Sequence, residues 1–173
     1  MITSFLEGCY TLDRKEIANE NIHQIISYYQ EEDNKIFSEE EKYLGLVEIP
    51  KINLKRGFYD KNSKLNTLSK NIYYLKESIP LEYNNSMIIL AAHRGNSKIS
   101  FFNDLDKLTI GDEIILSYKN KEYKYILSNK YDELKDGHLN IFRDATKDSL
   151  ILITCNKNRL KYQTIYFSYR KED

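Results

Sequence analysis

Two side chains that could act as a nucleophile and a base each follow a stretch of apolar, β-forming residues. The first stretch is residues 149–155, Ser-Leu-Ile-Leu-Ile-Thr-Cys, which ends in Cys155. The second is residues 86–92, and His93 follows it directly. Such runs are typical of strands that are buried on both faces. At the ends of two such strands, a thiolate assisted by an imidazole could attack a carbonyl carbon.

The pattern leaves a plainer interpretation of the cysteine open. Free cysteine is among the most buried residue types, so Cys155 could be a core residue without chemistry. His93 favours the chemical interpretation, because an imidazole can take the thiol proton and later protonate a leaving amine. We expect His23 and His138 to be exposed surface residues and Cys9 to be an inert thiol.

Length and composition limit the classes of function. A chain of 173 residues fits one domain with a real core, and its 26 basic and 26 acidic residues give no electrostatic case for nucleic acid or an anionic membrane. Two cysteines cannot form a disulfide framework, and no Cys/His spacing resembles a zinc site, so we predict no metal and no cofactor. Neither a membrane-spanning run nor a signal peptide is evident. We therefore expect either a cytosolic protein or one whose export segment precedes Met1.

Short strands dominate the expected secondary structure. Apolar spacing predicts an N-terminal helix over residues 13–30, and a short helix or 3₁₀ segment over residues 99–108. The polar stretch 132–148 is longer than an ordinary connection, which makes it a candidate functional loop. Many short strands with few helices predict a mainly β fold, a closed or nearly closed β-barrel over residues 44–173 with a helical appendage over residues 1–43. The expected strands are 44–50, 51–54, 57–59, 72–75, 86–92, 113–118, 122–131, 149–155 and 162–169, with a helical turn at 65–69 and a tight turn at Asn120-Lys121.

Five segments together resemble the sortase family of cysteine transpeptidases. The sequence Leu-Ile-Thr-Cys at residues 152–155 is similar to the family's Thr-Leu-x-Thr-Cys signature, with Ile151 where the first threonine usually stands. The sequence Ala-Ala-His-Arg-Gly at residues 91–95 resembles the family's Ala-Gly-His-Arg-Gly segment. The aromatic turn at 101–105, the strand at 47–52 and the turn at 111–112 also resemble family segments, so that the resemblance covers about residues 44–169.

The resemblance implies an eight-stranded β-barrel that acts at the outer face of Gram-positive cells, held to the membrane by a tether outside this chain. Cys155 would attack the Thr–Gly carbonyl of a Leu-Pro-x-Thr-Gly-like sorting signal, and His93 would protonate the departing amine. An amine acceptor from a cell-wall precursor or a pilin would then resolve the thioacyl enzyme. The loop 132–148 would form a wall of the substrate groove. Expected substrate-binding residues are Thr154, Ala92 and Phe101.

One position departs from the family pattern. Sortases carry an arginine on the strand after the cysteine, and Gln163 stands there in this chain. A neutral amide can donate a hydrogen bond to an oxyanion but brings no charge, and charge-assisted bonds are roughly twice as strong. Loss of an oxyanion donor typically costs ~2.7–4 kcal/mol. Arg159, four residues after Cys155, could take over this role or could be a solvated loop residue.

Gln163 therefore keeps several functions open. The first is an active transpeptidase. The second is a catalytically weak or silent sortase-like barrel that binds a sorting peptide or a surface-protein partner. A hydrolase that uses water as the acceptor and an unrelated β-barrel binding module are weaker alternatives.

Overall fold

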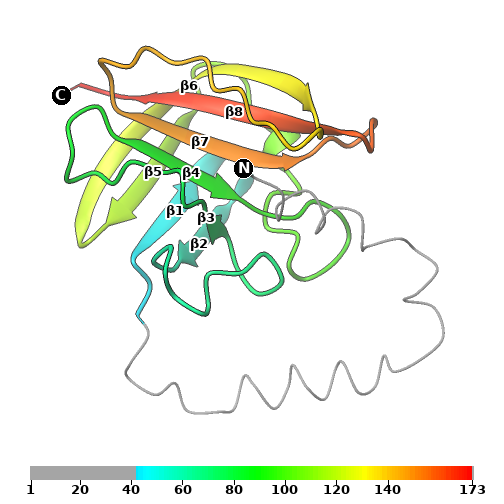
Figure 1. Ribbon diagram of the computed structural model, residues 1–173, viewed down its shortest axis with the longest axis horizontal. Helices are drawn as coiled ribbons and strands as arrows, with labels where there is room; N and C mark the ends of the chain where they lie inside the picture. Colours follow the sequence, from blue (N-terminus) through cyan, green and yellow to red (C-terminus); the bar gives the residue numbers. More distant parts are fainter. Residues whose placement is uncertain (1–41, 173) are drawn as a thin grey trace.

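The computed structural model describes residues 42–172 as one eight-stranded sheet with two short 3₁₀ segments (Figure 1). The expected helix over residues 13–30 lies outside the described residues. The elements are β1 (Gly45–Ile49), η1 (Pro50–Ile52), β2 (Leu54–Phe58), β3 (Tyr73–Tyr74), β4 (Met87–Ala91), η2 (Leu105–Lys107), β5 (Glu113–Tyr118), β6 (Lys121–Leu134), β7 (Ser149–Cys155) and β8 (Tyr162–Arg170).

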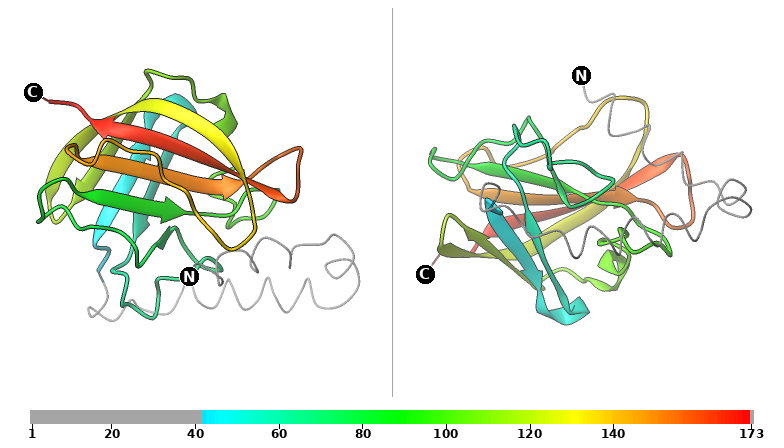
Figure 2. Two further views of the ribbon diagram at one scale, coloured as in Figure 1. Left: turned by 45° about the horizontal axis from the view of Figure 1, so that its top comes forward. Right: turned by 90° about the horizontal axis from the view of Figure 1, so that it is seen from below.

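The strands follow the order β2-β1-β5-β6-β8-β7-β4-β3 around the sheet. Neighbours pair antiparallel except β4 and β7, which run parallel. An isolated bridge between Phe58 and Ile72 brings the end of β2 to the segment that enters β3. The sheet therefore curls into a nearly closed barrel, as the sequence predicts (Figure 2).

Three expected elements have different limits in the structure. Pro50 lacks an amide donor, and residues 50–52 form η1 instead of a strand; Asn53 then reverses the chain at a φ of 51°. The tight turn is one residue earlier than expected, at Lys119 and Asn120, whose φ values of 47° and 64° suit a two-residue hairpin loop. Residues 65–69 form turns without a helix.

Strand β6 runs three residues beyond its expected end at Tyr131. The extension forms because residues 132–134 pair with residues 162–164 of β8. The connection from β6 to β7 is therefore residues 135–148, shorter than the predicted excursion of 132–148. The extension matters for function because it carries the end of β6 towards the start of β8.

The core occupies both faces of the strands that end at the candidate site. Six of the seven residues of β7 are buried, which confirms the expectation of a strand covered on both sides. Inside the barrel, Leu150 and Leu152 join the main core. On the outer face, Ile151 and Ile153 belong to a second cluster, which the connection 135–148 covers through apolar side chains. The second cluster comprises Leu75, Ile89, Ala91, Ile151, Ile153, Ile165 and Phe167, with Leu68, Tyr73, Met87, Tyr131, Leu139, Ile141 and Tyr169 packed against it.

Candidate functional site

Cys155 and His93 stand at the ends of two neighbouring parallel strands. Ala91 of β4 is level with Ile153 of β7, and the Ala92 amide donates to the Ile153 carbonyl at 3.2 Å. His93 lies two residues after Ala91, and Cys155 lies two residues after Ile153. Side chains alternate between the faces of a strand, so Cys155, the last residue of β7, belongs to the outer face that carries Ile153, while His93 follows the end of β4 by two residues. The register therefore brings the expected nucleophile and base to the same end of the sheet, on neighbouring strands.

A buried hydrogen bond fixes the relative position of the two strand ends. The Thr154 hydroxyl donates to the Ala92 carbonyl oxygen at 2.9 Å, and both residues are almost fully buried. Thr154 lies on the inner face, opposite the side chain of Cys155. The structure thus places Thr154 and Ala92 beneath the site as a clamp, and their expected contact with substrate stays a prediction.

Gln163 lies beside Cys155 on β8. Its backbone is level with Cys155 on one side and with Glu133 of β6 on the other. Its side chain is 2% exposed, and the Oε1 atom has no hydrogen-bond partner among the described residues. Gln163 therefore lies directly across from Cys155 on the neighbouring strand, and its side chain is an amide without a charge; its expected role at the oxyanion stays a prediction.

Arg159 is held away from Cys155. Its guanidinium forms an ion pair with Asp132 and stacks at 4.0 Å over the ring of Tyr162. Asp132 also accepts a hydrogen bond from the Thr164 hydroxyl at 2.7 Å. Thr164 alternates with position 163, so this network belongs to the face opposite the sulfur. The neighbouring Arg94 pairs with Asp106 at 2.7 Å.

A cation that the sequence analysis missed contacts the sulfur instead. Lys135 follows β6 directly, and its Nζ atom lies 3.4 Å from the Cys155 Sγ atom and 2.8 Å from the Leu160 carbonyl oxygen. The signal was present in the alternation of residues 131, 133 and 135. This alternation points to Lys135 only if the strand is known to extend past Tyr131.

The protonation and redox states of the site follow from burial and bonding. His93 is 6% exposed, and this burial lowers its pKa, which favours the neutral imidazole near pH 7. Burial also lowers the pKa of Lys135. The Cys155 sulfur takes part in a disulfide bond, so a thiolate is available only after reduction. The chain's other cysteine, Cys9, lies outside the described residues.

The connection 135–148 is tied down beside the site. The Tyr131 hydroxyl donates to the Asn140 carbonyl at 2.8 Å, and the Asn140 amide donates to Glu133 at 2.9 Å. The expected substrate residue Phe101 is half-buried, with the Arg56 guanidinium 4.4 Å from its ring centroid, and the amide of the next residue donates to the His93 carbonyl at 3.1 Å. The role of this connection as a groove wall and that of Phe101 as a substrate contact stay predictions.

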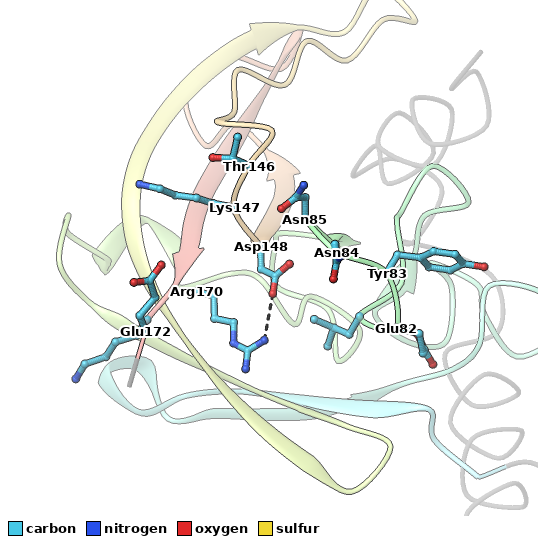
Figure 3. Close-up of a pocket in the computed structure, with 11 residues that line it drawn as sticks. Glu82, Tyr83, Asn84, Asn85, Thr146, Lys147, Asp148, Arg170 and Glu172 are labelled. Carbon is cyan, nitrogen blue, oxygen red and sulfur yellow. Dashed lines mark hydrogen bonds and ion pairs between the residues drawn. The ribbon is translucent and has the colours of Figure 1, made fainter.

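A pocket lies at the opposite end of the barrel (Figure 3). It is lined by residues that precede β4, residues that precede β7, and residues at the end of β8. An ion pair between Arg170 and Asp148, at 3.1 Å, runs along it. Because β4 and β7 are parallel, this pocket is one strand length, roughly 20 Å, from the end that carries Cys155. It is therefore separate from the candidate site.

The fold agrees with comparisons to known proteins. Solved structures match over most of the chain: a lid mutant of sortase A from Corynebacterium diphtheriae at 20% identity and a TM-score of 0.67, covering 98% of this chain and 93% of that one. Sortase C2 of pilus island 1 from Group B Streptococcus matches at 22% identity and a TM-score of 0.64, covering 75% and 74%. A sortase D5 transpeptidase from Clostridium perfringens matches at 18% identity and a TM-score of 0.63, covering 98% and 100%.

At these identities the structural matches establish the fold. No match was found among curated proteins. Within residues 42–172, no helix is long and apolar enough to cross a membrane. The family model for the sortase domain matches residues 47–170, which include β2 to β8 in full, most of β1, and both His93 and Cys155. This chain belongs to the sortase family.

Proposed function

We propose that this protein is a cysteine transpeptidase that cleaves a Leu-Pro-x-Thr-Gly-like sorting signal between threonine and glycine. The observation that supports the proposal is that Cys155 and His93 lie at the same ends of two paired parallel strands. The family match supports the same chemistry. The substrates are sorting signals of surface proteins or pilins, and the site of action is the extracellular face of the cell membrane.

The first half-reaction forms a thioacyl enzyme. The reduced Cys155 sulfur attacks the threonine carbonyl carbon, and a C–S bond forms. The thiol proton passes to His93, whose neutral imidazole is the form that burial favours. The C–N bond to glycine then breaks, and the His93 imidazolium gives its proton to the departing amine.

The second half-reaction transfers the acyl group. An amino group from a cell-wall precursor or a pilin attacks the thioester carbonyl, and the C–S bond breaks as the new amide bond forms. The electron pair returns to sulfur, and His93 takes a proton from the attacking amine. Thr154 and Ala92 hold the two strand ends in register, while Phe101 and the connection 135–148 border the path of the peptide.

A second function is favoured by one specific residue. Gln163 replaces the arginine expected on β8, and its buried amide supplies no positive charge beside the sulfur. A barrel with weak or lost catalysis could still bind a sorting peptide or a surface-protein partner. The two functions differ in whether a covalent intermediate forms.

Intact-mass analysis separates them. The reduced protein is incubated with a pool of Leu-Pro-x-Thr-Gly-like peptides, with and without an added amine such as triglycine. Transpeptidation predicts a hydroxylamine-sensitive adduct on Cys155, its discharge by the amine, and its absence from Cys155→Ala; we also expect His93→Ala to abolish turnover. Release to water alone, unchanged by the amine, would indicate a hydrolase.

The Gln163→Arg variant serves as the matched test of the binding function. An adduct in Gln163→Arg but none in the wild type would mean that the wild-type barrel lacks catalysis but still binds the peptide. No adduct in either protein, together with retention of a labelled peptide by Cys155→Ala, would establish binding without turnover. An unchanged product rate in Cys155→Ala would overturn the thioacyl mechanism.

A further inference from the structure

The charged end of Lys135 meets the sulfur of the candidate nucleophile. The Nζ atom is 3.4 Å from the Cys155 Sγ atom, and it also donates to the Leu160 carbonyl oxygen at 2.8 Å. The Lys135 backbone amide bonds the Lys161 carbonyl at 2.9 Å, which continues the pairing of β6 with β8. Lys135 is therefore anchored at its backbone and at its ammonium group, with the sulfur as a third contact.

The sheet explains why this side chain reaches Cys155. Strand β8 lies between β6 and β7, and Glu133 and Cys155 are both level with Gln163. Alternation puts Lys135 on the same face as Glu133. The lysine therefore approaches the sulfur from the far side of β8, across the face that holds Gln163 and Cys155.

The Lys135 ammonium group brings a positive charge to the sulfur, whereas the two nearby arginines are paired with carboxylates. Arg94 is engaged by Asp106, and Arg159 is engaged by Asp132. Gln163, beside Cys155, is neutral. Lys135 is partly buried, and burial lowers its pKa, so water competes less with the sulfur for its ammonium group than it would at an exposed lysine. A positive group in this position favours the thiolate over the thiol.

We propose that Lys135 is a catalytic residue of this enzyme, whose ammonium group stabilises the thiolate of Cys155. The inference rests on the proposed function for its role in turnover. In acylation, Lys135 favours the ionised sulfur that attacks the carbonyl carbon. In deacylation, the C–S bond breaks and its electron pair returns to sulfur, where the ammonium group stabilises the departing thiolate. Lys135 stays protonated throughout, and His93 carries the protons.

The test measures the ionisation of the thiol without requiring any substrate. The protein is reduced, the reductant is removed, and the rate of Cys155 alkylation by iodoacetamide is followed against pH by mass spectrometry. The variants are Lys135→Met, which keeps the length of the side chain, and Lys135→Arg, which keeps the charge. The control is Lys157→Met, which removes a cation two residues from Cys155 whose Nζ atom contacts Asp106 at 3.5 Å.

The proposal predicts that Lys135→Met raises the pKa of the Cys155 thiol by about 1 to 3, because an opposite charge within a few ångströms lowers a pKa by that amount. Lys135→Arg should retain most of the lowered value, and Lys157→Met should match the wild type. A Lys135→Met profile that coincides with the wild type overturns the proposal. If Lys135→Met fails to fold, the wild-type profile alone decides, since a thiol that titrates at or above its ordinary value of about 8.5 also overturns it.

Peptide turnover distinguishes this proposal from the proposed function. If the thiol pKa depends on Lys135 and no peptide adduct forms, the lysine contact stands and transpeptidation fails. If an adduct forms and its rate and the thiol pKa are both unchanged in Lys135→Met, transpeptidation stands and the lysine has no catalytic role. When both proposals hold, Lys135→Met should slow acylation about tenfold to a hundredfold at pH values below the raised thiol pKa.

Discussion

The bond between Thr154 and Ala92 gives a sharp prediction for stability. The Thr154 hydroxyl donates to the Ala92 carbonyl oxygen at 2.9 Å, at a point where both residues are almost fully buried. Thr154→Val keeps the shape of the side chain and removes the donor. The Ala92 carbonyl oxygen then loses its partner in a place that water does not reach.

The expected cost follows from that burial. A buried acceptor left without its partner costs about 1–3 kcal/mol, which is more than the net value of an ordinary hydrogen bond. Thr154→Ser keeps the hydroxyl and loses one methyl group, which costs ~0.8 kcal/mol. We therefore expect valine to lower the free energy of unfolding more than serine does, with a melting temperature lower by several degrees.

Urea denaturation under reducing conditions, followed by circular dichroism, measures both variants against the wild type. The reductant matters because Cys155 takes part in a disulfide, which would contribute to stability by itself. The reasoning is refuted if Thr154→Val unfolds at the wild-type midpoint, or if serine is the more destabilising substitution. Acylation should also fall in Thr154→Val and persist in Thr154→Ser, because this hydrogen bond joins the strand ends that precede Cys155 and His93.

Two further predictions concern residues near the site. Burial lowers the pKa of His93 below its ordinary 6.5. At pH values just below 6.5 the folded protein therefore binds fewer protons than the unfolded chain does. As a result, His93 should make the free energy of unfolding fall as the pH drops through this range. The loss between about pH 7.5 and pH 5.5 should be smaller in His93→Gln than in the wild type, and parallel denaturation midpoints would contradict the assignment. Arg159→Ala removes a partly exposed ion pair with Asp132, so it should cost at most about 1 kcal/mol and leave the acylation rate close to that of the wild type. A large drop in the acylation rate of Arg159→Ala would instead indicate that Arg159 takes part in catalysis.

The strands around the site were predictable because their sequences carry strong local signals. The run 149–155 is apolar on both faces, and its limits are confirmed to the residue by β7. The strand predicted over residues 86–92 is confirmed as β4, which is one residue shorter at each end. Once these two strands are fixed, the positions of Cys155 and His93 follow from where the strands end. What the sequence could not reveal is that β4 and β7 are parallel neighbours, since pairing depends on contacts across 62 residues.

The electrostatic partners of the site were harder to predict because they depend on tertiary contacts. Arg159 is close to Cys155 in sequence, yet Asp132 holds it on the other face of the sheet. Lys135 is 20 residues from Cys155 in sequence and contacts its sulfur. Asp132 and Glu133 are acidic residues, which are depleted in strands, so β-propensity gives little reason to extend β6; pairing with β8 provides that reason.

Gln163 occupies the position on β8 where the resemblance to sortases leads us to expect an arginine, and the two side chains differ in their chemistry. An arginine combines a permanent charge with a planar fork of donors, whereas a lysine is a compact point charge that can lose its proton. In this barrel the two properties belong to different residues: Lys135 brings the charge to the sulfur, and Gln163 brings a buried amide beside it. Restoring arginine at position 163 would place a second cation next to Lys135. Gln163→Arg should therefore gain less in the presence of Lys135 than in Lys135→Met, a difference that a double-mutant cycle on the acylation rate measures.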